Sequence, residues 1–124
     1  MTPPIPKDLE RQKIKLIELQ EDPSSNQLLA TSILSSMIRN RDFNHLIAHD
    51  LLLSLRAIDR LWPILIDHLL PVTTRINPKP LIAWKAWSRD CPPEHREQLL
   101  TTMIALLEKS PDYRMEYWLK KQLS

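Results

Sequence analysis

The sequence contains no glycine in 124 residues, and it contains eleven prolines. Glycine is the residue that most readily adopts positive φ, which primed hairpin turns, bulges, phosphate-cradling loops and many helix C-caps use. Proline fixes φ and lacks an N–H donor, so it can begin or end a helix without positive φ. The two counts together predict helices separated by prolines, and they argue against nucleotide sites built on glycine-rich loops.

Length and composition are those of one globular domain. The chain is 43% hydrophobic and 26% charged, close to ordinary globular values. We expect residues 1–6 to be a flexible N-terminus and residues 7–124 to form a single helical domain. Cys91 is the single cysteine, which excludes an intrachain disulfide and fits a reducing compartment.

No segment has the pattern of a membrane span or an export signal. The most apolar run, residues 46–70, is interrupted by charged residues and histidines, whereas a span needs about twenty mostly uncharged residues. We therefore expect a soluble, cytoplasmic protein with no membrane partner.

Apolar periodicity and capping signals give the helix boundaries. We predict helices at about residues 7–22, 23–40, 43–60, 59–70, 81–89, 93–109 and 112–123. Asp42 is the expected N-cap of the third helix, and a kink or a new start is expected near Asp59 and Pro63. Residues 71–80, with three prolines, are predicted to be the longest non-helical stretch. The last helix is expected to use Tyr113, Met115, Trp118 and Leu119 as its apolar stripe.

Short connections between successive helices favour antiparallel neighbours. The predicted fold is therefore all-α: a compact bundle or an irregular helical-hairpin stack of about six or seven helices with proline-punctuated connections. The breaks are expected at Asp22-Pro23, at Cys91-Pro92-Pro93 and at Ser110-Pro111.

A basic segment with interleaved tryptophans, residues 71–90, is the best local case for nucleic-acid binding. Its candidate contact residues are Arg75, Lys79, Trp84, Lys85, Trp87 and Arg89. Exposed indoles could stack on bases while the cations contact phosphate. Alternatively, the two tryptophans anchor a short helix in the core, because tryptophan is usually largely buried.

Two histidines one helical turn apart, His45 and His49, have a spacing that suits a metal ion, with Asp42 or Asp50 as a further ligand. No third ligand has the right spacing, so the alternative is two polar residues at the edge of a buried helix. The segment around His49, from Ala48 to Leu51 and on to Ile58, is also similar to the phospho-accepting histidine box of sensor kinases. The match departs at Leu52 and Ser54, where that family usually has arginine and proline. The resemblance implies a histidine phosphotransfer domain that receives phosphate at His49.

Catalytic chemistry has little support in the sequence. Cys91 lies near Glu94 and His95, but a nucleophilic cysteine also needs a group that stabilises the oxyanion, and nothing nearby has that pattern. We predict no enzyme activity, no catalytic residues, no metal and no cofactor.

The expected function is that of a non-catalytic adaptor that binds another protein, as a small subunit, chaperone or inhibitor of a larger assembly. The supply of large apolar residues exceeds what one core needs, so some could form a partner surface or a homodimer. A helical protein that binds nucleic acid through residues 71–90 is the alternative, and phosphotransfer is the third hypothesis.

Overall fold

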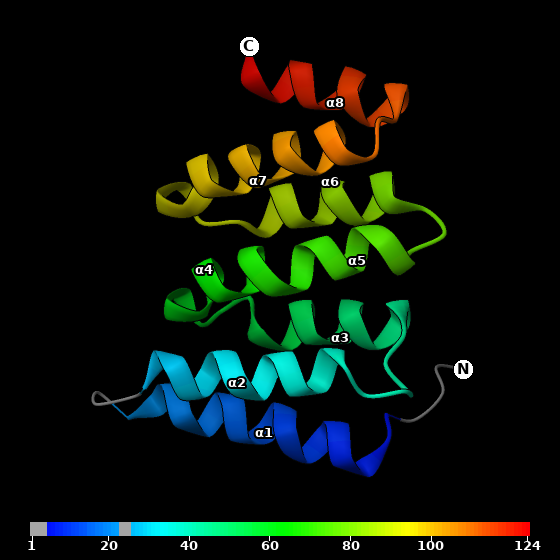
Figure 1. Ribbon diagram of the computed structural model, residues 1–124. Coiled ribbons are helices and arrows are strands. Elements are labelled where there is room, and N and C mark those ends of the chain that lie inside the picture. Colours follow the sequence, from blue (N-terminus) through cyan, green and yellow to red (C-terminus); the bar gives the residue numbers. More distant parts are fainter. Residues whose placement is uncertain (1–4, 23–25) are drawn as a thin grey trace.

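The computed structural model describes residues 5–22 and 26–124, and these residues form helices joined by short non-helical segments, with no strand among them (Figure 1). The helices are α1 (Lys7–Glu21), α2 (Gln27–Ile38), α3 (His45–Leu55), α4 (Trp62–Ile64), α5 (Leu70–Ile76), α6 (Pro80–Asp90), α7 (Arg96–Lys109) and α8 (Tyr113–Leu123). Three short elements join them: the 3₁₀ turns η1 (Asp59–Leu61) and η3 (Pro93–His95) and the π-helical turn η2 (Leu65–Leu69). The predicted all-α class is confirmed.

The helices follow one another as an antiparallel stack, from α1 at one end to α8 at the other (Figure 1). The segments α4, η2 and α5 are contiguous in sequence and act as one long helix. That helix contacts α2 on one side and α7 on the other through η2. Lys13 of α1 reaches Asp50 of α3 with an Nζ to Oδ2 distance of 3.1 Å. The arrangement is the helical-hairpin stack of the two predicted forms.

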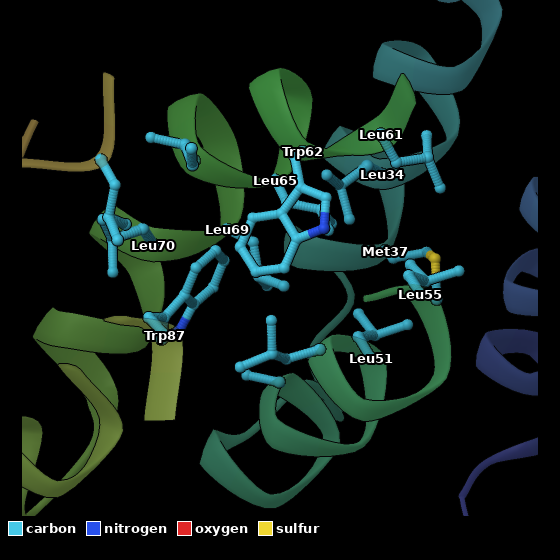
Figure 2. Packing of buried hydrophobic residues seen from close by; sticks show 14 of the residues in the cluster. Leu34, Met37, Leu51, Leu55, Leu61, Trp62, Leu65, Leu69, Leu70 and Trp87 are labelled. Carbon is cyan, nitrogen blue, oxygen red and sulfur yellow. The ribbon is translucent and has the colours of Figure 1, made fainter. Parts of the chain in front are cut away.

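The core runs along the stack and is centred on two tryptophans (Figure 2). Trp62 lies between leucines of its own helix and side chains from α2 and α3, and Trp87 of α6 approaches it (Figure 2). The ring centroids of Trp62 and Trp87 are 5.8 Å apart at an interplanar angle of 86°, an edge-to-face geometry that aromatic pairs favour. Both indoles are buried, so four helices share one apolar centre.

Helices α1, α5 and α6 end without glycine because the C-cap residue of each leaves in an extended conformation. The C-caps Asp22, Asn77 and Cys91 have ψ of 125°, 127° and 126°, and each precedes a proline in the sequence. A residue before proline is pushed out of the α region and into the β region. No residue in ranges 5–22 and 26–124 has positive φ, as the absence of glycine predicted.

Two predicted boundaries are wrong. Residues 71–80 were expected to be non-helical, yet α5 covers Leu70–Ile76. Pro71 is accommodated because the Leu70 N–H bonds to Leu65 O in the π-helical turn, which widens the helix where the proline ring would otherwise clash with the carbonyl four residues before it. The N-cap of α3 is Asn44 and not Asp42: Asn44 Oδ1 accepts from Leu46 N and Ile47 N at 2.9 and 3.0 Å.

Part of the N-terminal prediction lies outside the described residues. The flexible segment was expected at 1–6; residues 1–4 are not described, and Ile5 packs against the core. The predicted start of the second helix at Pro23 also falls outside the described ranges, and α2 is capped by Asn26. In the ranges that the structure describes, no helix is both long and apolar enough to cross a membrane.

Candidate interaction surfaces

The tryptophans of the predicted basic segment belong to the core. Trp84 is 0% exposed and Trp87 is 1% exposed. Trp84 Nε1–H donates to Thr74 Oγ1 at 2.7 Å, and its ring lies 6.4 Å from that of Trp118. Neither indole can stack on a base, so this part of the nucleic-acid prediction is wrong, and the alternative of a helix anchored by tryptophan holds.

The four cations of that segment are exposed, but they lie at different places on the surface. Arg75 lies on α5, and Lys79 is the N-cap residue of α6. Lys85 lines a groove between α6 and α8. Arg89 pairs with Asp90, with an Nε to Oδ1 distance of 3.3 Å. Of the six predicted contact residues, Lys85 is the one that takes part in the surface described next.

The α6–α8 groove is a hollow of about 610 Å³ that combines aromatic rings with positive charge. Its lining residues are Leu81, Lys85, Tyr113, Arg114, Glu116, Tyr117, Trp118, Lys120 and Lys121. Four of these side chains are cations and one is a carboxylate. The groove therefore presents a net positive, partly apolar surface at α8, and α8 is the last helix of the stack (Figure 1).

Two tyrosines one helical turn apart dominate the exposed side of α8. Tyr113 is 76% exposed and Tyr117 is 64% exposed, although Tyr113 was expected in the apolar stripe. Lys121 Nζ lies 4.6 Å from the centroid of the Tyr117 ring, within the range of a cation–π contact. The start of the helix is fixed by Asp112, whose Oδ1 accepts from Arg114 N at 3.0 Å and from Met115 N at 3.2 Å.

The spacing of residues in the last helix already indicates this surface. Tyr113 and Tyr117 share one helix face, while Met115 and Leu119 are buried on another. The i, i+4 spacing of the tyrosines among Arg114, Lys120 and Lys121 is the pattern of an exposed aromatic face. That these residues lie near Lys85 of α6 depends on the tertiary packing, which places residues of α6 and α8 around one groove and brings Trp84 near Trp118.

A second hollow, the α3–α6 cavity, lies between α3, the end of α5 and the start of α6 and has a volume of about 320 Å³. His45 and His49 both line it, as do Lys79 and Thr73. Asp50, one of the two aspartates considered as a further metal ligand, is paired with Lys13, with an Nζ to Oδ2 distance of 3.1 Å. His49 is exposed on α3, and its predicted role as a phosphate acceptor stays a prediction.

Three other residues with metal-ligating side chains lie close together, away from His45 and His49. Asp59, Glu94 and His95 each offer a ligand atom, and these atoms lie within 4.8 Å of one another; in the described ranges they are the one such group of three or more. His95 Nε2 is 3.5 Å from Asp59 Oδ2, so two of the three groups already form a pair when the imidazole is protonated.

Cys91 lies beside this cluster as a half-buried thiol. Burial raises its pKa to about 11, although the charge of Arg96 acts in the opposite direction. Its Sγ–H donates to Pro92 O at 3.4 Å. The thiol is therefore protonated near neutral pH, and a protonated thiol is not the nucleophilic form of cysteine.

Comparison with known proteins finds no match among protein-family models, curated proteins or solved structures. The functional proposal below therefore rests on the chemistry of the surfaces described above.

Proposed function

We propose that this chain is a non-catalytic interaction module that binds an acidic segment of another protein in the α6–α8 groove. The observation that carries the proposal is the pair of exposed tyrosines, Tyr113 and Tyr117, set among four cations. Tyrosine and arginine are enriched in the energetically important parts of protein interfaces. Tyrosine supplies a large contact area with few rotatable bonds, so little conformational entropy is lost when it is fixed.

The charge of the groove defines the partner. Lys85, Arg114, Lys120 and Lys121 face one carboxylate, Glu116, so a partner segment rich in aspartate or glutamate complements the surface. Half-buried Leu81 and Trp118 line the same groove and offer apolar contact for a leucine or an aromatic ring of that segment. An adaptor role needs this surface and no reactive group.

A photo-cross-linking experiment tests this proposal. The variant Tyr117→p-benzoylphenylalanine is expected to form a protein adduct of defined mass in the native host. The matched control, Ile14→p-benzoylphenylalanine, places the same group on α1, at the other end of the stack (Figure 1), where Ile14 is 45% exposed. The adduct should disappear when Lys85→Glu and Arg114→Glu are added, and it should persist with Lys7→Glu and Lys15→Glu on α1. The same adducts from both cross-linking positions would contradict the proposal.

Single-stranded nucleic acid is the second candidate for the same groove, because exposed tyrosines can stack on bases and the four cations can contact phosphate. For four phosphate contacts, the logarithm of the affinity should fall with the logarithm of salt concentration with a slope of about −3. Nuclease treatment separates the candidates. An adduct at position 117 that nuclease shortens supports nucleic acid, and one that only protease digests supports the protein partner.

A further inference from the structure

The cluster of Asp59, Glu94 and His95 joins two turns that are distant in sequence. Asp59 belongs to η1, which precedes α4, and Glu94 and His95 belong to η3, which precedes α7. The two turns lie at the same edge of the stack (Figure 1), and each of the three residues places a ligand atom within 4.8 Å of the others. An ion bound by all three would therefore tie the two turns together.

Both turns are anchored, so the fold itself sets the positions of the three side chains. In η1, Leu61 N donates to Ile58 O at 3.0 Å, and Leu61 is 1% exposed. In η3, His95 N donates to Pro92 O at 3.0 Å. Pro92 and Pro93 precede the two η3 ligands and fix φ at two successive residues. The backbone on either side of the cluster is thus held in place before any ion binds.

A buried ring nitrogen without a hydrogen bond faces this cluster. His95 Nε2 is buried from solvent and has no hydrogen-bond partner among the described residues. It lies 3.5 Å from Asp59 Oδ2, whereas a charged N–H···O bond is about 2.7–2.9 Å long. Around a tetrahedral zinc ion with bonds of about 2.0–2.1 Å, two ligand atoms lie about 3.4 Å apart. The separation of Nε2 and Oδ2 therefore matches two ligands of one ion better than it matches a hydrogen bond.

The ion has access to this nitrogen from the solvent. The side chain of Asp59 is 58% exposed, whereas that of His95 is 18% exposed, so the carboxylate forms the outer side of the cluster. Glu94 is also exposed, and its side chain has enough rotatable bonds to bring an oxygen closer to the other two ligand atoms. An ion can enter as these carboxylates turn.

The charge of the cluster favours a cation. With a neutral imidazole, it holds two carboxylates, and Glu94 makes no ion pair with any described residue. Arg96 is the next cation along the chain, but its guanidinium is engaged elsewhere. Its Nη1 donates to Ser88 Oγ and its Nη2 donates to Gln122 Oε1, both at 3.2 Å. A divalent ion would therefore balance the two carboxylates.

We propose that Asp59, Glu94 and His95 bind one zinc ion. The ion takes Nε2 of His95 and one oxygen of each carboxylate, with water in the fourth position. The imidazole favours zinc over magnesium and calcium, which take oxygen ligands. Bound zinc ties η1 to η3 and stabilises the folded chain. None of the three residues lines the α6–α8 groove, so the site does not rest on the proposed partner.

Calorimetric titration of zinc chloride into the metal-free, untagged chain tests the proposal, with thermal unfolding as a second readout. One zinc ion should bind per chain and should raise Tm, and an excess of magnesium should not displace it. Asp59→Asn and Glu94→Gln are exposed substitutions that keep the side-chain shape and the fold. Each should weaken zinc binding by tenfold or more, because losing even an outer-shell contact costs about 10–100-fold. His95→Ala should abolish binding.

The chain offers matched controls, because other groups can also bind zinc. The double variant His45→Ala, His49→Ala removes the histidine pair of α3, and Cys91→Ser removes the thiol beside the cluster. Both variants should bind zinc as the wild type does. Cobalt in place of zinc should give visible d–d absorption without a thiolate charge-transfer band, and Asp59→Asn should reduce that absorption.

Three results would overturn the proposal. They are the absence of zinc binding by the wild type, an unchanged affinity in Asp59→Asn and Glu94→Gln, and a loss of binding in either control variant, which would assign the zinc to the α3 histidines or to the thiol. The partner adduct at position 117 is measured independently, so failure of either proposal leaves the other standing.

Discussion

Individual capping residues let the helices begin and end without glycine. Asn26, Asn44 and Asp112 each accept two backbone N–H groups at a helix start, which satisfies donors that the helix itself cannot. At the C-terminal ends of α1, α5 and α6, a residue before proline leaves the helix in an extended conformation. A chain built in this way needs no left-handed residue, and the described ranges have none.

The cap of α3 gives the prediction at this scale. Asn44→Ala should lower the free energy of unfolding by about 1 kcal/mol, because Leu46 N and Ile47 N lose their acceptor. Asp42→Ala, at the position first expected to be the cap, should change it by less than about 0.5 kcal/mol, as an exposed surface substitution does. Urea denaturation followed by circular dichroism measures both. Equal losses for the two variants would show that Asn44 is not the cap.

At the scale of helices, α5 is held to α6 by a hydrogen bond inside the core. Trp84 Nε1–H donates to Thr74 Oγ1 at 2.7 Å, and Thr74 Oγ1 donates to Leu70 O at 2.8 Å. The indole is fully buried, so its N–H has no access to water. This contact helps to explain why a segment with Pro71 at its start is helical, because the helix places Thr74 against Trp84.

Replacing Thr74 tests that contact. Thr74→Val keeps the shape of the side chain but leaves the buried indole N–H unpaired, so it should lower the free energy of unfolding by about 1–2 kcal/mol. Thr74→Ser keeps the hydroxyl and should retain most of the hydrogen-bond contribution. Urea midpoints with unchanged m-values give the comparison. A valine variant as stable as the serine variant would contradict the role assigned to the hydroxyl.

On the scale of the whole molecule, ion pairs join helices that are distant in sequence. Asp90 at the end of α6 pairs with Arg56 at the end of α3, with an Nη1 to Oδ2 distance of 3.1 Å, and also with Arg89. Burial acts to raise the pKa of the Asp90 carboxyl, but the hydrogen bonds from Arg89 and Arg56 outweigh it and hold the pKa below its ordinary value of 3.8. The folded protein therefore binds this proton less readily than the unfolded chain does.

The contribution of Asp90 to the free energy of unfolding should depend on pH. Because its folded pKa is lowered, the contribution is present above about pH 4 and is lost as the pH falls through the folded pKa. Asp90→Asn should thus be less stable than the wild type at pH 6, and the difference should shrink toward pH 2.5. Urea unfolding across this range measures it, with the exposed Asp42→Asn as the control. A constant difference at all pH values would contradict the ion-pair explanation.

The candidate surfaces were harder to predict than the fold. Lys85 is exposed, whereas Trp84 and Trp87, the tryptophans predicted as contact residues beside it, are in the core. Those three residues are neighbours on one short helix, and their different exposure follows from which face of α6 meets α5, α7 and α8. Tyr113 and Tyr117 were not predicted as surface contact residues, because the groove that they line also includes Lys85, which comes from another helix.

The sequence by itself determined the all-α class, most of the breaks and, over residues 5–22 and 26–124, the absence of positive φ. These properties are local: they follow from proline, from asparagine and aspartate caps, and from apolar periodicity over a few turns. Only the tertiary structure decided that residues 70–76 are helical, that Trp84 and Trp87 are buried, and that the α6–α8 groove and the α3–α6 cavity exist. The reason is that burial is a property of packing, which brings together side chains from helices far apart in the chain, so no local pattern contains it.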